Sequence, residues 1–469
     1  MSRSPRYRLS AAEKDALLAQ QAALIERQTA AIEALRQRVA ELEAQLARPK
    51  KTSRNAHVQP SQDPKGGGGG KGAGRSKPKK KRPPRPGVSR RLATTPDATV
   101  ACHATHCRSC GADVRAVRQR RRRRYDHVDI PPIVPHVTRV ELHGGRCPGC
   151  SKRFTAEPPA GMAPGTPFGT NIHAFLAYLH HSHHVGFARL ARLMRELFGL
   201  AISEGAIANA LRRLAEPLAA VRRSIRERLR AAAVIASDET TSRIDGVTHR
   251  HRVFVADDAV LHEIAPRRAK AVAEAVLGER RPEVWISDRY AGQQNLATAQ
   301  QICLAHVLRD VRFAADGGDT VTAPQLTRLL QWTIQVGRRR HELADSTLRT
   351  YRGKAERWLD DLVAKPAPHP AGRELQALIK AWRSTFFVFL EDRRVPATNN
   401  ESEREVRPSV VFRKVTGGFR SPWGAEIHAG YRSLTSTAAR TGQTAFDAIR
   451  DLVADALPTR SRTATAPTT

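Results

Sequence analysis

The segment 48–92 constrains the fold more than any other feature of the chain, because it contains almost no large apolar side chains. It is rich in glycine, proline and lysine, and it cannot bury enough surface to offset the entropy lost on ordering. We therefore predict a flexible, basic, disordered linker over 48–92. Its basic run, Lys79–Arg85, could contact phosphates without reading sequence, and a merely solvated charge run explains it equally well.

The segment 11–47 precedes this linker and shows a heptad pattern without glycine or proline. One series is Leu18, Ile25, Ile32, Val39 and Leu46, and the matching series is Gln21, Gln28, Leu35 and Leu42. The pattern predicts a coiled coil over 11–47, which would make the protein a homodimer or higher oligomer. A single amphipathic helix packed on its own chain is the alternative, and the basic, glycine-rich stretch that follows favours self-association.

The chain is strongly basic, with 79 Lys+Arg against 45 Asp+Glu and a net charge of +34 over 469 residues. This excess indicates a polyanionic partner, most simply nucleic acid; a ribosome-like or membrane-surface protein is the alternative. The N-terminus lacks the apolar core of a signal peptide, and no run of about 18 apolar residues occurs. We therefore expect a cytoplasmic protein with no membrane partner.

Two Cys-x-x-Cys pairs, Cys107/Cys110 and Cys147/Cys150, stand out among the six cysteines. Thiols stay reduced in the cytoplasm, so these pairs indicate metal ligands rather than disulfides. They predict a zinc ribbon over 95–160, in which four thiolates close a structural, tetrahedral Zn²⁺ site. Chance pairs of buried cysteines are the alternative.

Other residues of this region complete the prediction for the ribbon. Pro135–Leu142, between the pairs, has a strand-like pattern, and the run Arg118–Arg124 would give the module a phosphate-facing edge. The neighbours Cys102, His103 and His106 leave the ligand set slightly open.

The segment 161–230 has a helical pattern, and part of it resembles a helix-turn-helix. Phe187–Phe198 and Ser203–Leu214 would be helices joined by a short turn, with Ser203 as the N-cap of the second. The candidate recognition helix carries Asn209, Arg212 and Arg213. Two helices of a plain bundle give the same pattern, so DNA binding by this module is an open alternative. In the run His180–His184, satisfied or exposed histidines are favoured over a metal site.

The segment from about 232 changes to short apolar runs that predict strands. The predicted order is β-β-β-α-β, with strands at Val234–Ala236, Arg252–Ala256, Val260–Ile264 and Glu283–Ile286 and a helix at Arg268–Leu277. Residues of about 322–392 are predicted helical, with a break near Lys365–Pro368. A last helix is expected near Ala445–Ala454, and the tail 457–469 is expected to be disordered.

Two aspartates follow apolar strands in this region. Asp238 comes after Val234–Ala236, and Asp288 comes after Val284–Ser287. Metal-assisted phosphodiester chemistry requires hard oxygen ligands that hold two divalent ions about 3.5–4 Å apart, and strand ends can supply them. In a chain with 45 acidic residues such placements also arise by chance.

Four sequence blocks occur in order along the chain. They are Asp238-Glu239-Thr240, Ser287-Asp288-Arg289-Tyr290-Ala291-Gly292, Cys303-Leu304-Ala305-His306 and Asn399-Asn400-Glu401-Ser402-Glu403-Arg404, continued by Arg407-Pro408 and Arg413-Lys414. These blocks resemble those of the TnpC-type transposases of the IS66 family of insertion sequences. The resemblance covers nearly the whole chain, although Thr398 and Leu304 depart from the residues usual in the family.

The resemblance implies an α/β multidomain protein with an RNase H-like catalytic domain over 231–456 and a helical insertion at about 316–392. It implies a catalytic set of Asp238, Asp288 and Glu403, which would hold Mg²⁺ or Mn²⁺. Glu401 is the close competitor of Glu403, and residues two apart on a helix face away from each other. The resemblance selects Glu403.

The same resemblance implies roles for neighbouring residues. Phosphate contacts are expected from four basic side chains, which are Arg404, Arg407, Arg413 and Lys414. Cys303 and His306, three apart on one helix face, are expected to support the site, and a buried cysteine with a core histidine explains them nearly as well.

The sequence thus predicts a DNA transposase that binds the ends of its element, cleaves strands and transfers them to target DNA. As an insertion-sequence protein it is expected to be bacterial and associated with the nucleoid, with possible accessory transposition proteins. The alternative is a catalytically inactive, sequence-specific DNA-binding protein derived from a transposase. A nuclease with the same core, without strand joining, is a third interpretation.

Overall fold

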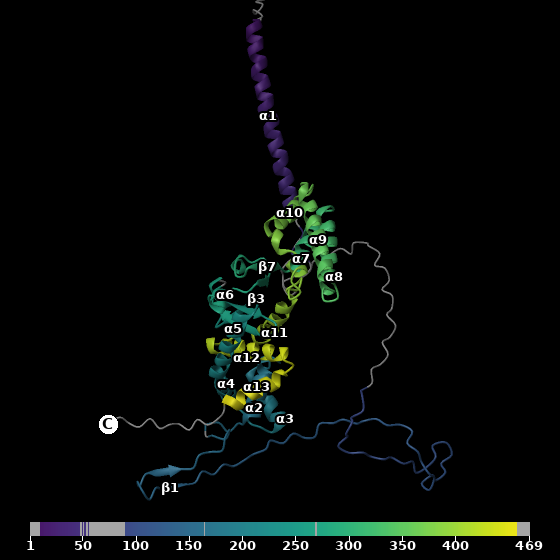
Figure 1. Cartoon of the computed structure of the whole chain (residues 1–469), viewed down its shortest axis with the longest axis vertical. Coiled ribbons are helices and arrows are strands. Elements are labelled where there is room, and N and C mark those ends of the chain that lie inside the picture. The colour runs from purple at the N-terminus through teal and green to yellow at the C-terminus, as the bar shows by residue number, and fades with distance from the viewer. Residues whose placement is uncertain are drawn as a thin grey trace, which may run out of the picture. The chain divides into compact units, whose positions relative to one another are not determined.

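The computed structural model describes residues 10–46, 49, 51, 52, 55, 90–163, 165–267 and 270–456 (Figure 1). Most of the predicted linker, including the basic run at 79–85, and the whole predicted tail 457–469 lie outside these residues. The chain divides into two compact units, which are Met1–Lys65 with Val140–Arg192 and Ile202–Thr469, and Gly66–Arg139 with Leu193–Ala201. Among the described residues, no helix has the length and apolar character needed to cross a membrane.

The heptad-patterned segment forms a single helix, α1 (Ala11–Leu46), as predicted. It begins with a capping box, in which the Ser10 N–H donates to Glu13 Oε2 at 2.8 Å and the Glu13 N–H donates to Ser10 Oγ at 3.3 Å. Leu18, Ile25 and Ile32, three residues of the heptad series, are exposed. The apolar stripe of α1 is therefore accessible in the single chain.

A mixed sheet of five strands has the order β5-β4-β3-β6-β7. The first three strands in sequence pair antiparallel, whereas β6 and β7 run parallel to β3. The strands are β3 (Val234–Ile244), β4 (Val247–Val255), β5 (Val260–Ala265), β6 (Val284–Ser287) and β7 (Ala299–Ile302), and helix α6 (Lys270–Leu277) connects β5 to β6.

Strands β3 and β4 extend further than the apolar pattern indicated. They meet in a two-residue turn at Asp245 and Gly246, which have φ values of 46° and 75°. An Asp-Gly pair with positive φ at both positions suits the type I′ turn, whose twist matches that of the strands. The hairpin therefore carries β3 through polar residues as far as Ile244.

The two faces of the sheet belong to different hydrophobic clusters, because side chains alternate along each strand. Ile235, Phe254 and Trp285 pack with residues of α5 (Ala215–Ala231) and α6 on one face. Val253 and Ile286 face the other way and pack with residues of two helices, which are α7 (Leu304–Asp316) and α11 (Asn400–Thr416). The sheet is thus covered by helices on both faces.

Three α-helices lie between α7 and α11 in the sequence; they pack with one another, and the first and third also pack with α7 (Figure 1). They are α8 (Thr322–Arg338), α9 (Asp345–Ala364) and α10 (Pro370–Trp382). The predicted break near Lys365–Pro368 falls between α9 and α10, as expected.

The helices that precede the sheet pack with those that end the chain (Figure 1). Helix α2 contacts α13, and both α4 and α5 contact α12, which also contacts β5. The bounds are α2 (Thr170–His181), α3 (Phe187–Phe198), α4 (Glu204–Arg212), α12 (Pro422–Arg440) and α13 (Ala445–Ala456). Ser203 caps α4 as predicted, with its Oγ accepting from the Ala206 N–H at 3.1 Å.

The cysteine-rich region contains less strand than predicted. Two short strands, β1 (Gly144–Arg146) and β2 (Arg153–Thr155), pair across the second Cys-x-x-Cys turn. The strand predicted over Pro135–Leu142 is absent; its residues are mostly exposed and pair with no neighbouring strand. The apolar alternation there has no partner to pack against.

Candidate active site

Asp238 lies within β3 rather than at its end, which corrects the sequence prediction. Parallel pairing of β3 with β6 covers only Val234–Ala236, whereas antiparallel pairing with β4 continues and places Asp238 opposite Val253. Asp238 therefore lies two residues beyond the point where β6 stops pairing. At Asp238, β3 has no paired strand on the side of β6, because β6 is shorter and has already ended.

Asp288 directly follows β6, as predicted. The Tyr290 N–H donates to Asp288 Oδ1 at 3.1 Å, which restricts the orientation of the carboxylate. Because β3 and β6 are parallel neighbours, residues after the paired segment of each strand meet at one edge. Asp238 and Asp288 both occupy that edge.

Asn399 fixes the first turn of α11 on the same edge. Its side-chain amide donates to the Ser237 carbonyl at 2.8 Å, and its backbone N–H donates to Cys303 Sγ at 3.1 Å. Ser402 Oγ donates to the Asn399 amide oxygen. Asn399 is 1% exposed, so these hydrogen bonds are shielded from water. Together they tie α11 to the residue before Asp238.

Glu403 and Glu401 project to different sides of α11. Glu403 Oε1 lies 3.3 Å from His306 Nε2, and the other oxygen lies 4.0 Å from the Arg309 guanidinium. Glu401 instead pairs with Arg440 at 2.6 Å. The structure thus turns Glu403 toward α7 and Glu401 toward α12.

The three acidic side chains interact electrostatically. Burial raises the pKa of Asp238 to about 7; the negative charges of Glu403 and Asp288 add to this rise, and the Glu239 N–H, donating to Asp238 Oδ1 at 2.8 Å, opposes it. A group whose charged form is disfavoured in this way gains from a nearby cation. Three carboxylates that repel one another are the donor set that Mg²⁺ or Mn²⁺ prefers, so the residues present fit such an ion.

Cys303 and His306 lie beside Glu403. Cys303 is the N-cap of α7, and its N–H donates to the Ser287 carbonyl at 2.9 Å, next to Asp288. Burial raises the pKa of the Cys303 thiol to about 11. Both residues are buried, as the structural alternative requires, and both also contact the candidate site.

Three residues near the carboxylates were given no role from the sequence. Asn399 occurs within one of the four blocks without a role of its own, and Arg309 lies outside them. Glu239, within the Asp-Glu-Thr block, forms a buried ion pair with Arg252 at 2.9 Å, with side-chain exposures of 6% and 3%. Strand alternation is the available signal for Glu239, because it separates Glu239 from Asp238 on the two faces.

The four basic residues of α11 divide into two kinds. Arg404, Arg407 and Lys414 are exposed, and their spacing of three and seven residues aligns them along one side of the helix. Arg413 is half-buried and donates to both the carbonyl and the hydroxyl of Thr241 on β3. Its guanidinium is thus engaged within the fold.

The predicted recognition residues lie on the exposed side of α4. Asn209, Arg212 and Arg213 are all exposed. The Arg212 guanidinium stacks over the Trp423 ring at 4.5 Å from the centroid, and Arg213 donates to the Gly165 carbonyl at 2.8 Å. Both arginines therefore already have partners within the chain.

The two Cys-x-x-Cys pairs form turns of the same geometry. In each, the first cysteine's N–H donates to the carbonyl five residues on, at 2.8 Å for Cys107 and 2.9 Å for Cys147, and the residue four positions on has positive φ. Backbone N–H groups lower the pKa of both first cysteines, led by Ser109 for Cys107 and by Cys150 for Cys147.

The second cysteines of the pairs, Cys110 and Cys150, lie beside the first, because their backbone N–H and thiol groups help to lower the pKa of Cys107 and Cys147. Both second cysteines are exposed, whereas the first ones are half-buried. Each turn by itself supplies two of the four predicted ligands. The four-thiolate site therefore stays a prediction.

Two histidines of the run at 180–184 form side-chain contacts in the core, whereas His181 Nε2 and His184 Nδ1 are buried and accept or donate no hydrogen bond among the described residues. His180 Nδ1 hydrogen-bonds to the Val185 carbonyl at 2.8 Å, and His181 Nδ1 lies 3.2 Å from His428 Nδ1 in a buried pair. Burial lowers the pKa of all three rings. The contact of His180 and the exposure of His183 fit the interpretation favoured from the sequence, and the two unbonded nitrogens do not.

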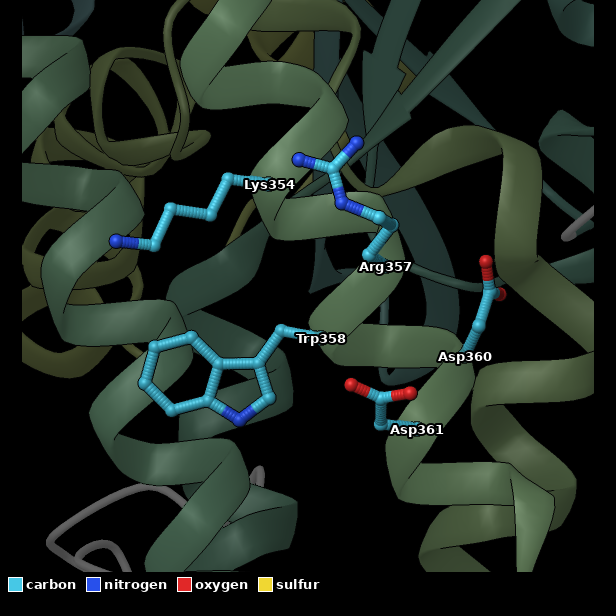
Figure 2. A pocket seen from close by; sticks show the side chains of 5 residues that line it. All are labelled: Lys354, Arg357, Trp358, Asp360 and Asp361. Atoms are coloured by element: carbon cyan, nitrogen blue, oxygen red, sulfur yellow. The ribbon is translucent and has the colours of Figure 1, made fainter.

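A surface pocket occurs on α9, away from these residues in sequence. Figure 2 shows its lining side chains, which are Lys354, Arg357, Trp358, Asp360 and Asp361. Asp360 already pairs with Arg383 at 2.7 Å, and Lys354 lies over a tryptophan ring. The pocket contains none of the predicted site residues.

The raised pKa of Asp238 predicts a pH-dependent stability in the absence of metal. A carboxyl with a raised pKa contributes stability that is complete below its unfolded pKa of about 4 and is lost as pH rises through about 7. Asp238→Asn removes the charge, so it should raise the melting temperature at pH 8 by about 2–4 °C per kcal/mol of repulsion removed. At pH 4, near the unfolded pKa, it should change the melting temperature much less.

Differential scanning calorimetry in a chelating buffer measures both shifts, and the exposed Asp455→Asn serves as the matched control. Equal shifts of Asp238→Asn at both pH values would contradict the prediction. Adding Mg²⁺ should stabilise the wild-type protein at pH 8 more than the variant.

Comparison with known proteins identifies the family of the chain. No curated protein matches it. Residues 165–427, more than half of the chain, match the family described as Transposase IS66 family. This range contains all three carboxylates at the edge of the sheet and the helices that position them. The chain belongs to the IS66 family of transposases.

Proposed function

We propose that the protein is a DDE transposase that cleaves DNA strands at the ends of its element and joins them to target DNA. The observation that carries the proposal is the meeting of Asp238 and Asp288 at one edge of the sheet, where Asn399 also ties the helix of Glu403 to β3. Asp238 lies in β3, Asp288 directly follows β6 and Glu403 lies in α11, so the three come from segments far apart in sequence. The sheet order, an antiparallel meander followed by two parallel strands, supports an RNase H-like core.

Asp238, Asp288 and Glu403 are the residues that would hold Mg²⁺ or Mn²⁺. When bound, a pair of such ions supplies activation of the attacking oxygen and stabilisation of the leaving oxygen. Near neutral pH, burial and repulsion favour a proton on Asp238, and this proton leaves when positive charge arrives. The carboxylate network of the chain is thus set up to accept cations.

The exposed stripe Arg404, Arg407 and Lys414 extends along α11 from Glu403. Charged side chains in this position would bind phosphates of the DNA backbone and set its register without reading bases. Arg413 has a structural role instead, because its hydrogen bond to the Thr241 carbonyl holds α11 against β3. Asn209, with Arg212 and Arg213 beside it, supports end recognition by α4, although both arginines would have to leave their present partners.

Strand cleavage tests the catalytic assignment. Asp238→Asn and Glu403→Gln should each lower Mg²⁺-dependent cleavage and joining of an end-containing DNA by about 100-fold or more, because a metal contributes several kcal/mol to the transition state. Glu401→Gln is the matched control, since Glu401 is 53% exposed and pairs with Arg440 on another side of α11.

A gel assay on labelled DNA reports both steps. If Asp238→Asn and Glu403→Gln match the wild type, the assignment is wrong. If the wild type binds ends but neither cleaves nor joins strands, the inactive DNA-binding alternative replaces it. Cleavage without joining would instead favour the nuclease.

Self-association through α1 is a second part of the proposal. Its support is the exposed heptad series, in which Ile25 and Ile32 are 61% and 51% exposed. Burying such a stripe between two copies would pair two element ends in one complex.

The oligomer should therefore depend on this stripe. Ile25→Asp with Ile32→Asp should convert the dimer or higher oligomer to monomer, because charges would be buried in the seam. Ala30→Asp, on the outer side of the same helix, should leave the mass unchanged. Light scattering coupled to size-exclusion chromatography measures both, and a wild-type monomer would contradict self-association.

A structural zinc in the cysteine-rich region is the third part, with Cys107, Cys110, Cys147 and Cys150 as its ligands. Its support is the pair of matching turns, each of which presents two thiols with backbone donors that favour thiolates. Four such thiolates would close a tetrahedral site.

Zinc content of the full-length chain tests this site. Cys107→Ser and Cys147→Ser should each lower the bound zinc by about one equivalent, whereas Cys102→Ser, outside the pairs, should not. Elemental analysis after dialysis gives the stoichiometry. Unchanged zinc in both pair variants would exclude the ribbon site.

A further inference from the structure

The structure brings a thiol, an imidazole and a carboxylate together at the edge of the candidate active site. One ligand atom from each of Cys303, His306 and Glu403 lies within 4.8 Å of the other two. In the part of the chain that the structure describes, no other set of three histidine, cysteine or acidic residues meets this distance. The set comes from two helices, α7 and α11, and from the N-cap of α7.

The spacing of the imidazole and carboxylate suits two ligands of one ion. Zinc bonds of about 2.0–2.1 Å to nitrogen and oxygen, at the tetrahedral angle, place those atoms about 3.3 Å apart. The distance between His306 Nε2 and Glu403 Oε1 is 3.3 Å. Glu403 Oε1 is also buried, and it accepts no hydrogen bond from the described residues. Glu403 Oε1 and His306 Nε2 therefore lie close together without forming a hydrogen bond.

The third residue, Cys303, is held where its sulfur could bind the same ion. Cys303 and His306 are three residues apart at the start of α7, so they share a face of that helix. Cys303 Sγ accepts from the Asn399 N–H at 3.1 Å, and the N-terminal end of a helix also favours negative charge. A sulfur within 4.8 Å needs to move by about an ångström to reach the roughly 3.6 Å expected between tetrahedral sulfur and nitrogen ligands.

The chemistry of this set differs from that of the aspartates. Thiolate and imidazole ligands select Zn²⁺ and other thiophilic ions, whereas carboxylates alone suit Mg²⁺ and Mn²⁺. We propose that Cys303, His306 and Glu403 bind a thiophilic divalent ion such as Zn²⁺, and that this ion draws Glu403 away from Asp238 and Asp288. Three protein ligands leave the fourth position open to water.

The site has a consequence for catalysis. The binding itself needs only these three side chains, whereas the consequence rests on the proposed function, in which Glu403 is also a ligand of Mg²⁺. An ion that turns the Glu403 carboxylate toward Cys303 and His306 takes this ligand from Asp238 and Asp288, so Zn²⁺ would inhibit Mg²⁺-dependent cleavage. Glu403 is thereby a shared ligand whose partner depends on the metal present.

Cobalt binding tests the site independently of activity. Co²⁺ replaces Zn²⁺ and gives a sulfur-to-metal charge-transfer absorption when a thiolate is bound. Full-length protein, stripped of metal and titrated with Co²⁺, should bind about one equivalent more than Cys303→Ala, and the difference spectrum should show one thiolate. Cys102→Ala, which removes an exposed cysteine outside both pairs, is the matched control and should bind as the wild type does.

A second variant guards against misfolding of Cys303→Ala. His306→Gln keeps a polar side chain of similar length and should also lose about one equivalent of Co²⁺, with an unchanged circular dichroism spectrum. Equal binding and identical spectra in wild type, Cys303→Ala and His306→Gln would overturn the proposal.

Inhibition separates this proposal from the catalytic one. Normalised to its own zinc-free rate, Cys303→Ala should need at least about tenfold more Zn²⁺ for half-inhibition than the wild type. If Zn²⁺ inhibits Cys303→Ala and the wild type equally, Glu403 is not shared between the two metal sites. A further outcome combines two results: the wild type does not cleave DNA, and the variants bind less Co²⁺ than it does. In that case the metal site is supported and the catalytic assignment is wrong.

Discussion

The hydrogen bonds of Asn399 are the interaction on which the candidate site depends. One buried side chain joins β3, through the Ser237 carbonyl, to the first turn of α11, and its backbone N–H reaches Cys303 at the start of α7. Loss of a buried amide's partner costs about 1–3 kcal/mol, and here it would also release the helix that carries Glu403. The carboxylates of the site come from separate elements, so their arrangement is only as fixed as this junction.

The arrangement proposed for metal binding is unfavourable for the protein alone. Burial and two neighbouring negative charges raise the pKa of Asp238 to about 7, which means that its charged form destabilises the metal-free fold. The sheet tolerates this because its two faces are packed by separate clusters, with Trp285 and Phe254 on one side and Val253 and Ile286 on the other. The packed faces of the sheet thus stabilise the fold, and the carboxylates that repel one another lie at one edge only.

Several elements were predictable because their sequence patterns are local. The apolar runs located β4, β5 and β6, and the heptads located α1. Strand β7, Ala299–Ile302, was missed because it contains two glutamines. Gln301 is nevertheless buried, where its amide donates to the Phe386 carbonyl at 3.1 Å and accepts from the Phe389 N–H at 3.1 Å. These partners lie more than 80 residues away in sequence, beyond the reach of a periodicity argument.

The sequence by itself determined the motif residues and the helix and strand segments that carry them, since periodicity and turn chemistry act over a few residues. Only the tertiary structure decided which side chains meet. It turned Glu403 toward His306 and Glu401 toward Arg440, and it engaged Arg413 with β3 rather than leaving it exposed. Side-chain direction depends on how α11 docks against the sheet, and that docking is set by contacts between residues far apart in the chain.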